Sequence, residues 1–284
     1  MCAAERTAHA SRAGAARTDY GAIVVCGGGC YGEYYVRQLR RAAARGVIRW
    51  RDLVVVDRDP RCRVATGADT DAGDAIRSAP ALRVVVEAWD SFFDDYLGRA
   101  AARPLESALD AIVPSPLMPH LMYEWLQRRA RARWPGRLVE ARPLPAPPRT
   151  PWERAGADGT HYASFATWLC PVNCVEPARC PHTRGPRDWS MPDAARAWVA
   201  ERRAAGDQLA GPAIFHCVHR AFGVGMFDTA EALAADALVA EAGTGGAANV
   251  LVGTVSHCHG AFGLLHLGPT RPSALPVEAG RGEI

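Results

Sequence analysis

The sequence predicts an α/β protein in two parts. These are an N-terminal domain built on a doubly wound parallel sheet and a smaller C-terminal α/β lobe carrying a Cys/His cluster. Three observations lead to this prediction: short apolar runs alternate with helical stretches from residue 21 to about 142, prolines crowd residues 143–151, and cysteine and histidine gather between residues 170 and 259. Alternation of strands and helices is typical of parallel sheets covered by helices.

Composition gives the boundaries of four segments. We expect a disordered leader over residues 1–20, a first α/β domain over 21–145, a Cys/His-rich α/β domain over 146–268 and a flexible tail over 269–284. The proline-rich connector is stiff and extended, which suits a boundary between lobes.

The charged residues exclude several kinds of chemistry. The 284 residues contain no lysine, so all 33 basic side chains are arginine, and the net charge is +3. A lysine Schiff base, a Walker lysine and a lysine general base are therefore excluded. Nearly balanced charge favours no nucleic-acid partner. Because no secretory leader or membrane-spanning run stands out, we expect a cytoplasmic protein with no membrane partner.

A glycine-rich turn joins the first expected strand to the first expected helix. The apolar run 22–26 leads directly into Gly27, Gly29 and Gly32, in G-x-G-x-x-G spacing, and a helical stretch follows up to Gly46. In such a turn the first glycine permits the tight bend, the second lets a pyrophosphate approach the backbone, and the third lets helix and strand pack closely. The free N–H groups of the helix N-terminus then favour an anion.

Further apolar runs continue the strand–helix alternation. We expect strands over residues 53–56, 82–87, 111–113 and 137–141, with a helix over about 120–133. Asp57 ends the second strand, where its carboxylate can accept hydrogen bonds from a ribose diol, and Arg58 follows it.

On the motifs CGGGCYG and VVVD, residues 21–142 resemble NAD(P)-binding Rossmann domains, without pointing to a subfamily. The resemblance implies a dinucleotide-binding domain, with NAD preferred over NADP because of the acid at residue 57. It implies cofactor contacts at Gly27, Gly28, Gly29, Cys30, Tyr31, Gly32, Asp57 and Arg58. The alternative is a methyltransferase that uses S-adenosylmethionine, since such enzymes share the topology and the acid after the second strand.

The second lobe opens with a cysteine-rich loop of spacing C-x3-C-x5-C-P-H. Its members are Cys170, Cys174, Cys180 and His182. In a reducing compartment, clustered cysteines are ligands or redox thiols more often than disulfides. Prolines in the loop prevent a continuous helix, so the thiols are displayed from a restrained backbone. We expect an iron–sulfur cluster or a zinc ion here, and the spacing does not separate the two.

Two expected strand ends supply candidates for the missing fourth ligand. The segments HCVHRAFGVG (216–225) and HCHGAFGLL (257–265) share a His-Cys-His pattern followed by Ala-Phe-Gly. The first segment begins within an expected strand over residues 213–219, and the second follows an expected strand over 249–256. Between them, Asp228 to Glu231 has capping-box spacing and opens an expected helix to about residue 241. If the two strands are parallel neighbours, both groups emerge at one sheet edge. Strand alternation then places Cys217 with His219 and separates Cys258 from its flanking histidines. We take Cys217 and His259 as further metal ligands.

These features together predict an NAD(P)-dependent oxidoreductase with a metal or iron–sulfur centre near the nicotinamide. His219, His257 and His120 are the candidate proton donors or acceptors. The expected partner is a small-molecule substrate, and arginines beside the cysteine loop suit an anionic one. A regulatory protein that senses NAD(H) or a metal without turnover is a second alternative.

Overall fold

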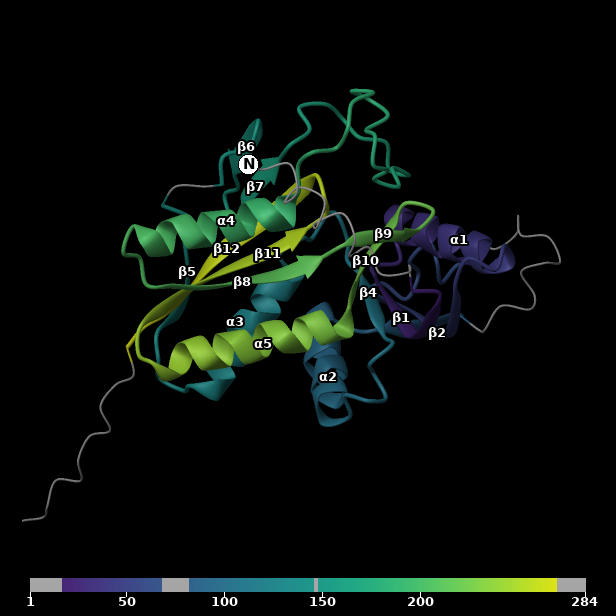
Figure 1. The fold of residues 1–284 in the computed structure, drawn as a ribbon. Helices are drawn as coiled ribbons and strands as arrows, with labels where there is room; N and C mark the ends of the chain where they lie inside the picture. Colours follow the sequence, from purple (N-terminus) through teal and green to yellow (C-terminus); the bar gives the residue numbers. More distant parts are fainter. Residues whose placement is uncertain (1–16, 68–81, 146–147, 270–284) are drawn as a thin grey trace, which may run out of the picture.

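A computed structural model describes residues 17–67, 82–145 and 148–269, and they form an α/β protein with two mixed sheets (Figure 1). The first sheet has the order β3-β2-β1-β4-β10-β9. Its strands are β1 (Asp19–Cys26), β2 (Arg49–Asp57), β3 (Leu82–Val86), β4 (Ala111–Val113), β9 (Val218–Ala221) and β10 (Val224–Asp228). The four strands β3, β2, β1 and β4 are parallel, whereas β10 is antiparallel to β4 and to β9.

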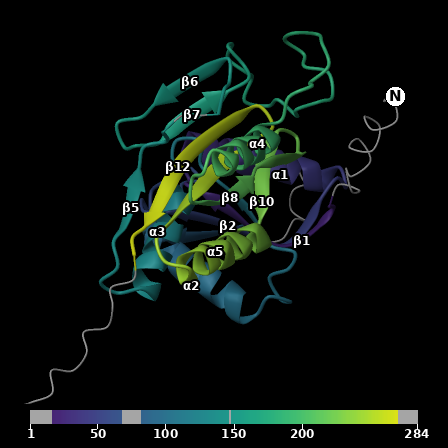
Figure 2. The same cartoon turned by 60° about the vertical axis from the view of Figure 1, so that its left-hand side comes forward.

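The second sheet has the order β6-β7-β12-β11-β8, and β5 also pairs with β12. Its strands are β5 (Val139–Arg142), β6 (Trp152–Ala155), β7 (His161–Ser164), β8 (Leu209–His216), β11 (Ala248–Val255) and β12 (His259–Leu267). Only β8 and β11 are parallel to each other, so their carboxyl ends lie at the same edge. In Figure 2, β5, β6 and β7 lie along one side of the long strand β12.

Helices cover both sheets. They are α1 (Cys30–Ala44), α2 (Trp89–Ala102), α3 (Leu121–Arg133), α4 (Met191–Ala204) and α5 (Thr229–Thr244). Helix α1 packs on one face of the first sheet, where Val36 and Leu39 meet Ile23 and Val25. Helix α4 covers one face of the second sheet, and α5 lies on its other side (Figure 1).

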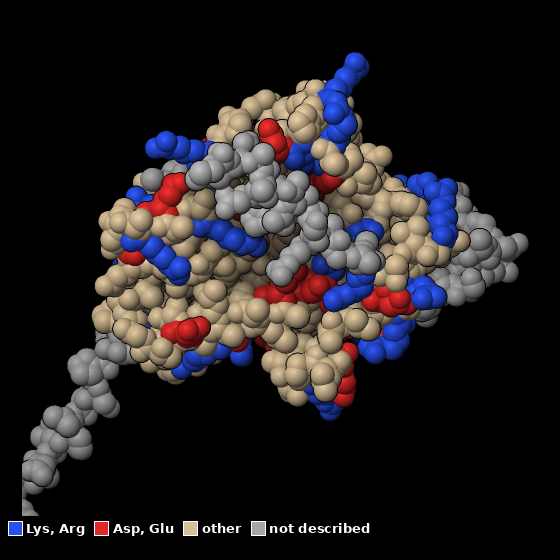
Figure 3. All heavy atoms as spheres, viewed as in Figure 1, with Lys and Arg blue, Asp and Glu red and all other residues tan. Residues whose placement is uncertain are grey.

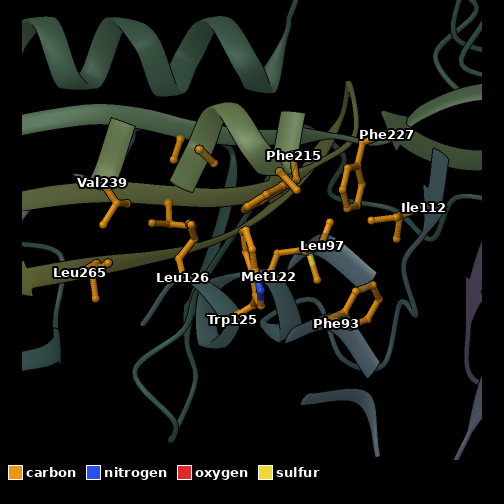
Figure 4. Packing of buried hydrophobic residues seen from close by; sticks show 14 of the residues in the cluster. Phe93, Leu97, Ile112, Met122, Trp125, Leu126, Phe215, Phe227, Val239 and Leu265 are labelled. Carbon is orange, nitrogen blue, oxygen red and sulfur yellow. The ribbon is translucent and has the colours of Figure 1, made fainter. Parts of the chain in front are cut away.

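One large apolar cluster joins the two sheets. It includes Val24 and Val54 of the first sheet, Phe215 and Val250 of the second, and side chains of α2, α3 and α5. Figure 4 shows Trp125 of α3 within this cluster, among residues drawn from both parts of the chain. The expected boundary near residue 145 therefore does not coincide with a break in the hydrophobic core.

Local sequence signals explain several element ends. The capping box at Asp228 is confirmed, because its side chain accepts from the N3 backbone while Glu231 accepts from the Asp228 backbone N–H. At α4, the Ser190 hydroxyl accepts from the Asp193 N–H, and Pro192 occupies the first turn. Such caps satisfy backbone donors that the helix itself leaves unpaired.

The structure corrects four expectations about the elements. The apolar run at 137–141, expected to extend the first sheet, forms β5 in the second sheet and pairs antiparallel with β12. The run 213–219, expected to be one strand, divides at Cys217 into β8 and β9, which belong to different sheets. The first sheet is mixed, because β10 and β9 join it antiparallel. Asp19 and Tyr20, assigned to the leader, begin β1.

Other expectations fall on undescribed parts of the chain. Most of the expected leader (residues 1–16) and of the expected tail (270–284) lies outside the described residues, as do positions 146–147 of the connector. Within the described ranges, no helix has the length and apolar character needed to cross a membrane. Basic and acidic side chains are interspersed on the face shown in Figure 3.

Candidate functional site

A cavity of about 510 Å³ lies where the carboxyl edges of the two sheets meet. From the first sheet it is lined by the segment after β4, including Pro114 and Ser115, and by Tyr31 and Tyr35 of α1. From the second sheet it is lined by the ends of β11 and β7 and the start of β12. Because α1 follows β1 on one face and α3 follows β4 on the other, the cavity opens at a topological switch point, where open α/β sheets bind their ligands.

The glycine turn next to this cavity has the geometry its spacing predicts. Gly27 has φ +87°, a backbone conformation that L side chains rarely adopt. A Cβ on Gly32 would lie 1.9 Å from the Gly27 carbonyl oxygen, so only glycine permits this approach of helix and turn. Around Gly29, by contrast, an added Cβ would meet no described atom within 4 Å. The second glycine thus leaves open space beside the helix N-terminus.

Asp57 lies at the tip of β2, directly beside the turn. Its Oδ2 accepts from the Gly28 N–H at 2.6 Å, and its Oδ1 accepts from the Asp59 N–H at 2.9 Å. The carboxylate therefore also fixes the glycine turn. Arg58 points elsewhere, because its guanidinium stacks over the Trp89 ring at 4.5 Å. Cys30 is exposed at the start of α1.

Two histidines line the cavity in the same tautomer. The Nδ1 of His219 donates to the Cys174 carbonyl, which can only accept. The Nδ1 of His259 lies 2.9 Å from the Ser164 hydroxyl, whose single proton goes to the Ala166 carbonyl at 2.7 Å, so His259 must donate. In both rings Nε2 therefore carries no proton and has a free lone pair. Burial lowers the pKa of His259, which favours its neutral form.

A second cavity of about 240 Å³ adjoins the first and is lined by four thiols. They are Cys170, Cys174, Cys180 and Cys258. The first three come from the long loop between β7 and α4, at the top of Figure 1. The fourth comes from the short connection between β11 and β12. Three of them, Cys170, Cys174 and Cys258, also line the larger cavity. His182 and Arg187 complete the polar wall of this four-cysteine cavity.

The cysteine loop is fixed to the sheet edges by several polar contacts. The Glu176 carboxylate accepts from the His257 backbone N–H at 3.1 Å, and the Cys258 carbonyl accepts from the Phe165 N–H at 2.9 Å. Backbone N–H groups of Thr183 and His182 donate to the Cys180 sulfur and lower the pKa of that thiol. These hydrogen bonds fix the backbone that carries the cysteines, as expected from the prolines in the loop.

The other two candidate proton donors or acceptors, His257 and His120, are not among the described residues that line the larger cavity. His257 lies beside His216, whose pKa its charge helps to lower. His120 precedes α3 and faces Asp158 and Glu124, at 3.9 and 3.7 Å. Over the described residues, no three His, Cys, Asp or Glu side chains are arranged to hold one metal ion.

The parallel pairing of β8 and β11 is confirmed, since His216 is in register with Val255. The expected separation of Cys258 from His259 is wrong, because both line the cavity. Alternation fails there because β11 ends at Val255 and residues 256–258 form a turn. The short polar segment before the Ala-Phe-Gly run was the available signal for that turn. Ser164, Glu176 and Tyr35 were also missed, since nothing in their local sequence marks them.

The two similar His-Cys-His segments adopt different structures. In the first, Ala221 ends β9 and Phe222–Gly223 form the turn to β10, with positive φ at both residues. In the second, Ala261, Phe262 and Gly263 lie inside β12. The likeness is therefore limited to the position of the His and Cys residues, just after two parallel strands.

His216 predicts how acid affects stability. Burial lowers its pKa to about 4, whereas an unfolded histidine titrates near 6.5. Below pH 6.5 the unfolded chain therefore binds a proton that the folded chain does not, so stability falls between pH 6.5 and pH 4. Between pH 7.5 and pH 5, the free energy of unfolding should therefore fall by about 2 kcal/mol less in His216→Gln than in the wild type. Urea unfolding at the two pH values measures this, and equal losses would contradict it.

The fold and site define an α/β protein in which cysteines and histidines line adjoining cavities at the carboxyl edges of two sheets. Residues 122–268 match AF_1314_C, a family described as "Uncharacterized protein, C-terminal domain". Because the match covers more than half of the chain, the chain belongs to this family. The matched region contains the cysteine loop, His219 and His259. No curated protein and no solved structure matches the chain.

Proposed function

We propose that the protein is an NAD(P)-dependent oxidoreductase whose reaction takes place in the larger cavity, beside a metal or iron–sulfur centre held by the cysteine loop. One observation carries the proposal: the glycine turn and the cavity adjoin, because Tyr31, in the first turn of α1, is part of the cavity wall. The parallel order β3-β2-β1-β4 with helices on both faces supports a Rossmann-like first domain.

The residues of the turn fit a dinucleotide. No described side chain caps α1, so its first N–H groups are available to a pyrophosphate. The open space at Gly29 allows such a group to approach the backbone. Asp57 accepts two backbone hydrogen bonds, and a carboxylate has about four acceptor positions, so a ribose hydroxyl can still donate to it. The acid favours NAD over NADP.

The cavity supplies the proton chemistry that such a reaction needs. A bound nicotinamide donates or accepts a hydride. The Nε2 atoms of His219 and His259 can each accept a proton from the substrate or return one, because their Nδ1 atoms are engaged. Tyr35 is partly buried, and burial raises its pKa to about 12, so its hydroxyl remains a hydrogen-bond donor at neutral pH.

The proposal predicts a specific effect of changing His259. We expect the protein to oxidise NADH with a dye acceptor, and His259→Gln to lower kcat by about 10²- to 10³-fold while the dissociation constant for NADH stays unchanged. The control is His266→Gln, on the same strand, whose Nδ1 lies 2.8 Å from Asn249 Oδ1 outside both cavities. It should retain turnover.

Other results would contradict the proposal in different ways. NADH binding with no turnover, whatever the acceptor, would favour a sensor of NAD(H) over an enzyme. Equal turnover by the wild type and His259→Gln would show that His259 does not transfer the proton, and His219 would then be the candidate for that step.

A further inference from the structure

The four-cysteine cavity identifies both the missing ligand and the kind of group bound. We propose that Cys170, Cys174, Cys180 and Cys258 together bind a four-iron, four-sulfide cluster. Cys258 is thus the fourth ligand, in place of Cys217 or His259. The inference deepens the proposed function, and the cluster's part in catalysis rests on that function. Binding of the cluster itself does not.

Four cysteines from two distant segments converge on one cavity. Three come from a loop and one from a turn 78 residues further along the chain than Cys180, yet all four line one cavity of about 240 Å³. Four cysteines from separate segments around a common space are the ligand set of a two-iron or four-iron sulfur cluster or of a structural zinc.

The space that these cysteines share suits a group larger than a zinc ion. In a tetrahedral zinc site, Zn–S bonds of about 2.3 Å hold the sulfurs only about 3.8 Å apart. Among the described residues no three ligating side chains converge on one ion, although the four thiols share a cavity. Sulfurs that surround a common space without meeting at a point match a bulkier group. Iron–sulfur clusters are the bulkier groups that four cysteines bind, and a cluster of four irons and four sulfides is larger than one of two irons and two sulfides.

A hydrogen-bond donor and a basic side chain lie beside these cysteines. Trp189 donates its indole N–H to the Cys258 sulfur at 3.3 Å. Four thiolates around a cluster carry net negative charge, and the Arg187 guanidinium forms part of the cavity wall. Its Nε is buried and has no hydrogen-bond partner among the described residues. Donors aimed at ligand sulfurs and a nearby positive charge stabilise such a cluster.

Cys217 allows a matched test, because it is the counterpart of Cys258 in the first His-Cys-His segment. Both thiols are buried and both line the larger cavity, but only Cys258 lines the four-cysteine cavity. The experiment is anaerobic purification of the full chain and of Cys258→Ala and Cys217→Ala. Iron, zinc and acid-labile sulfide are then measured, together with visible absorption and the electron paramagnetic resonance spectrum after dithionite reduction.

We expect about four irons and four sulfides per chain in the wild type and in Cys217→Ala, with broad absorption near 400 nm. Cys258→Ala should retain less than about a quarter of the iron. Stoichiometric zinc without iron, about two irons and two sulfides per chain, a metal-free folded protein, or full iron content in Cys258→Ala would each overturn the proposal. If circular dichroism shows Cys258→Ala to be unfolded, Cys170→Ala, in the half-buried part of the loop, must show the same loss.

The cluster and the oxidoreductase function fail separately. Dinucleotide binding is measured by calorimetry on the same preparations. A cluster in a protein that does not bind NADH would support the proposed cluster and contradict the proposed oxidoreductase function. NADH binding by a folded, iron-free protein would do the reverse.

Discussion

Gly32→Ala is expected to destabilise the protein and to abolish dinucleotide binding. Its Cβ would lie 1.9 Å from the Gly27 carbonyl oxygen and 2.9 Å from the Gly27 carbonyl carbon, both backbone atoms that cannot move without displacing the turn. The turn is also tied to β2 through the Gly28 N–H and Asp57. We expect a loss of about 3 kcal/mol or more in the free energy of unfolding, measured by urea denaturation.

Gly29→Ala is the matched control, three residues earlier in the same turn. Its backbone has φ −73°, and an added Cβ would meet no described atom within 4 Å. Stability should change by less than about 1 kcal/mol, whereas the affinity for NADH should fall about 10- to 100-fold because the methyl group takes the space of the pyrophosphate. Unchanged affinity in this variant would mean that the turn is structural only.

Arg137→Met, just before β5, is expected to destabilise the second sheet strongly. The Arg137 guanidinium donates to the carbonyls of Gly268 at 2.6 Å and Gly243 at 2.7 Å, and also to that of Gly246. It thereby joins the end of β12 to the C-terminal end of α5. Methionine keeps the apolar stem but leaves three carbonyls without their donor, which costs about 3–5 kcal/mol.

An exposed arginine serves as the control for this change. Arg196 pairs with Asp193 at 2.8 Å on the surface of α4, where the two side chains are 60% and 74% exposed. Arg196→Met should change the free energy of unfolding by less than about 0.5 kcal/mol. A loss in Arg137→Met no larger than this would show that the three carbonyls find other donors.

Sequence patterns predicted the fold where the signal was local. The apolar runs of β1, β2, β3 and β4, the glycine turn between Cys26 and Cys30, and the capping box at Asp228 lie where expected. These features are determined by neighbouring residues, through burial of apolar runs, backbone freedom and hydrogen bonds at a helix end. They can therefore be predicted without knowing how the rest of the chain folds.

The errors arose where distant segments decide the structure. β5 has the apolar character of a first-sheet strand, but it pairs with β12, more than a hundred residues later. The chain leaves the second sheet at Cys217 and enters the first at β9, a change of partner that a continuous run from Ala213 to His219 does not show. Pairing partners depend on the whole core, which here spans both sheets.

The candidate site shows the same division. The cysteine loop was found from its spacing, and His219 and His259 from their strand ends. The place of Cys258 in the wall of the four-cysteine cavity was missed because the turn at residues 256–258 breaks the alternation of a strand. Ser164, which fixes the tautomer of His259, is an ordinary serine at the end of β7. Only the arrangement in space distinguishes it.

Equilibrium binding of NADH and S-adenosylmethionine to the anaerobically purified protein tests the proposed dinucleotide site. Calorimetric titration of the wild type and Gly29→Ala with each compound separates a dinucleotide site from the methyltransferase alternative. We predict saturable binding of one NADH per chain, weakened about 10- to 100-fold in Gly29→Ala, and no binding of S-adenosylmethionine. Binding of S-adenosylmethionine alone, or of neither compound, would contradict the proposed NAD(P)-dependent function.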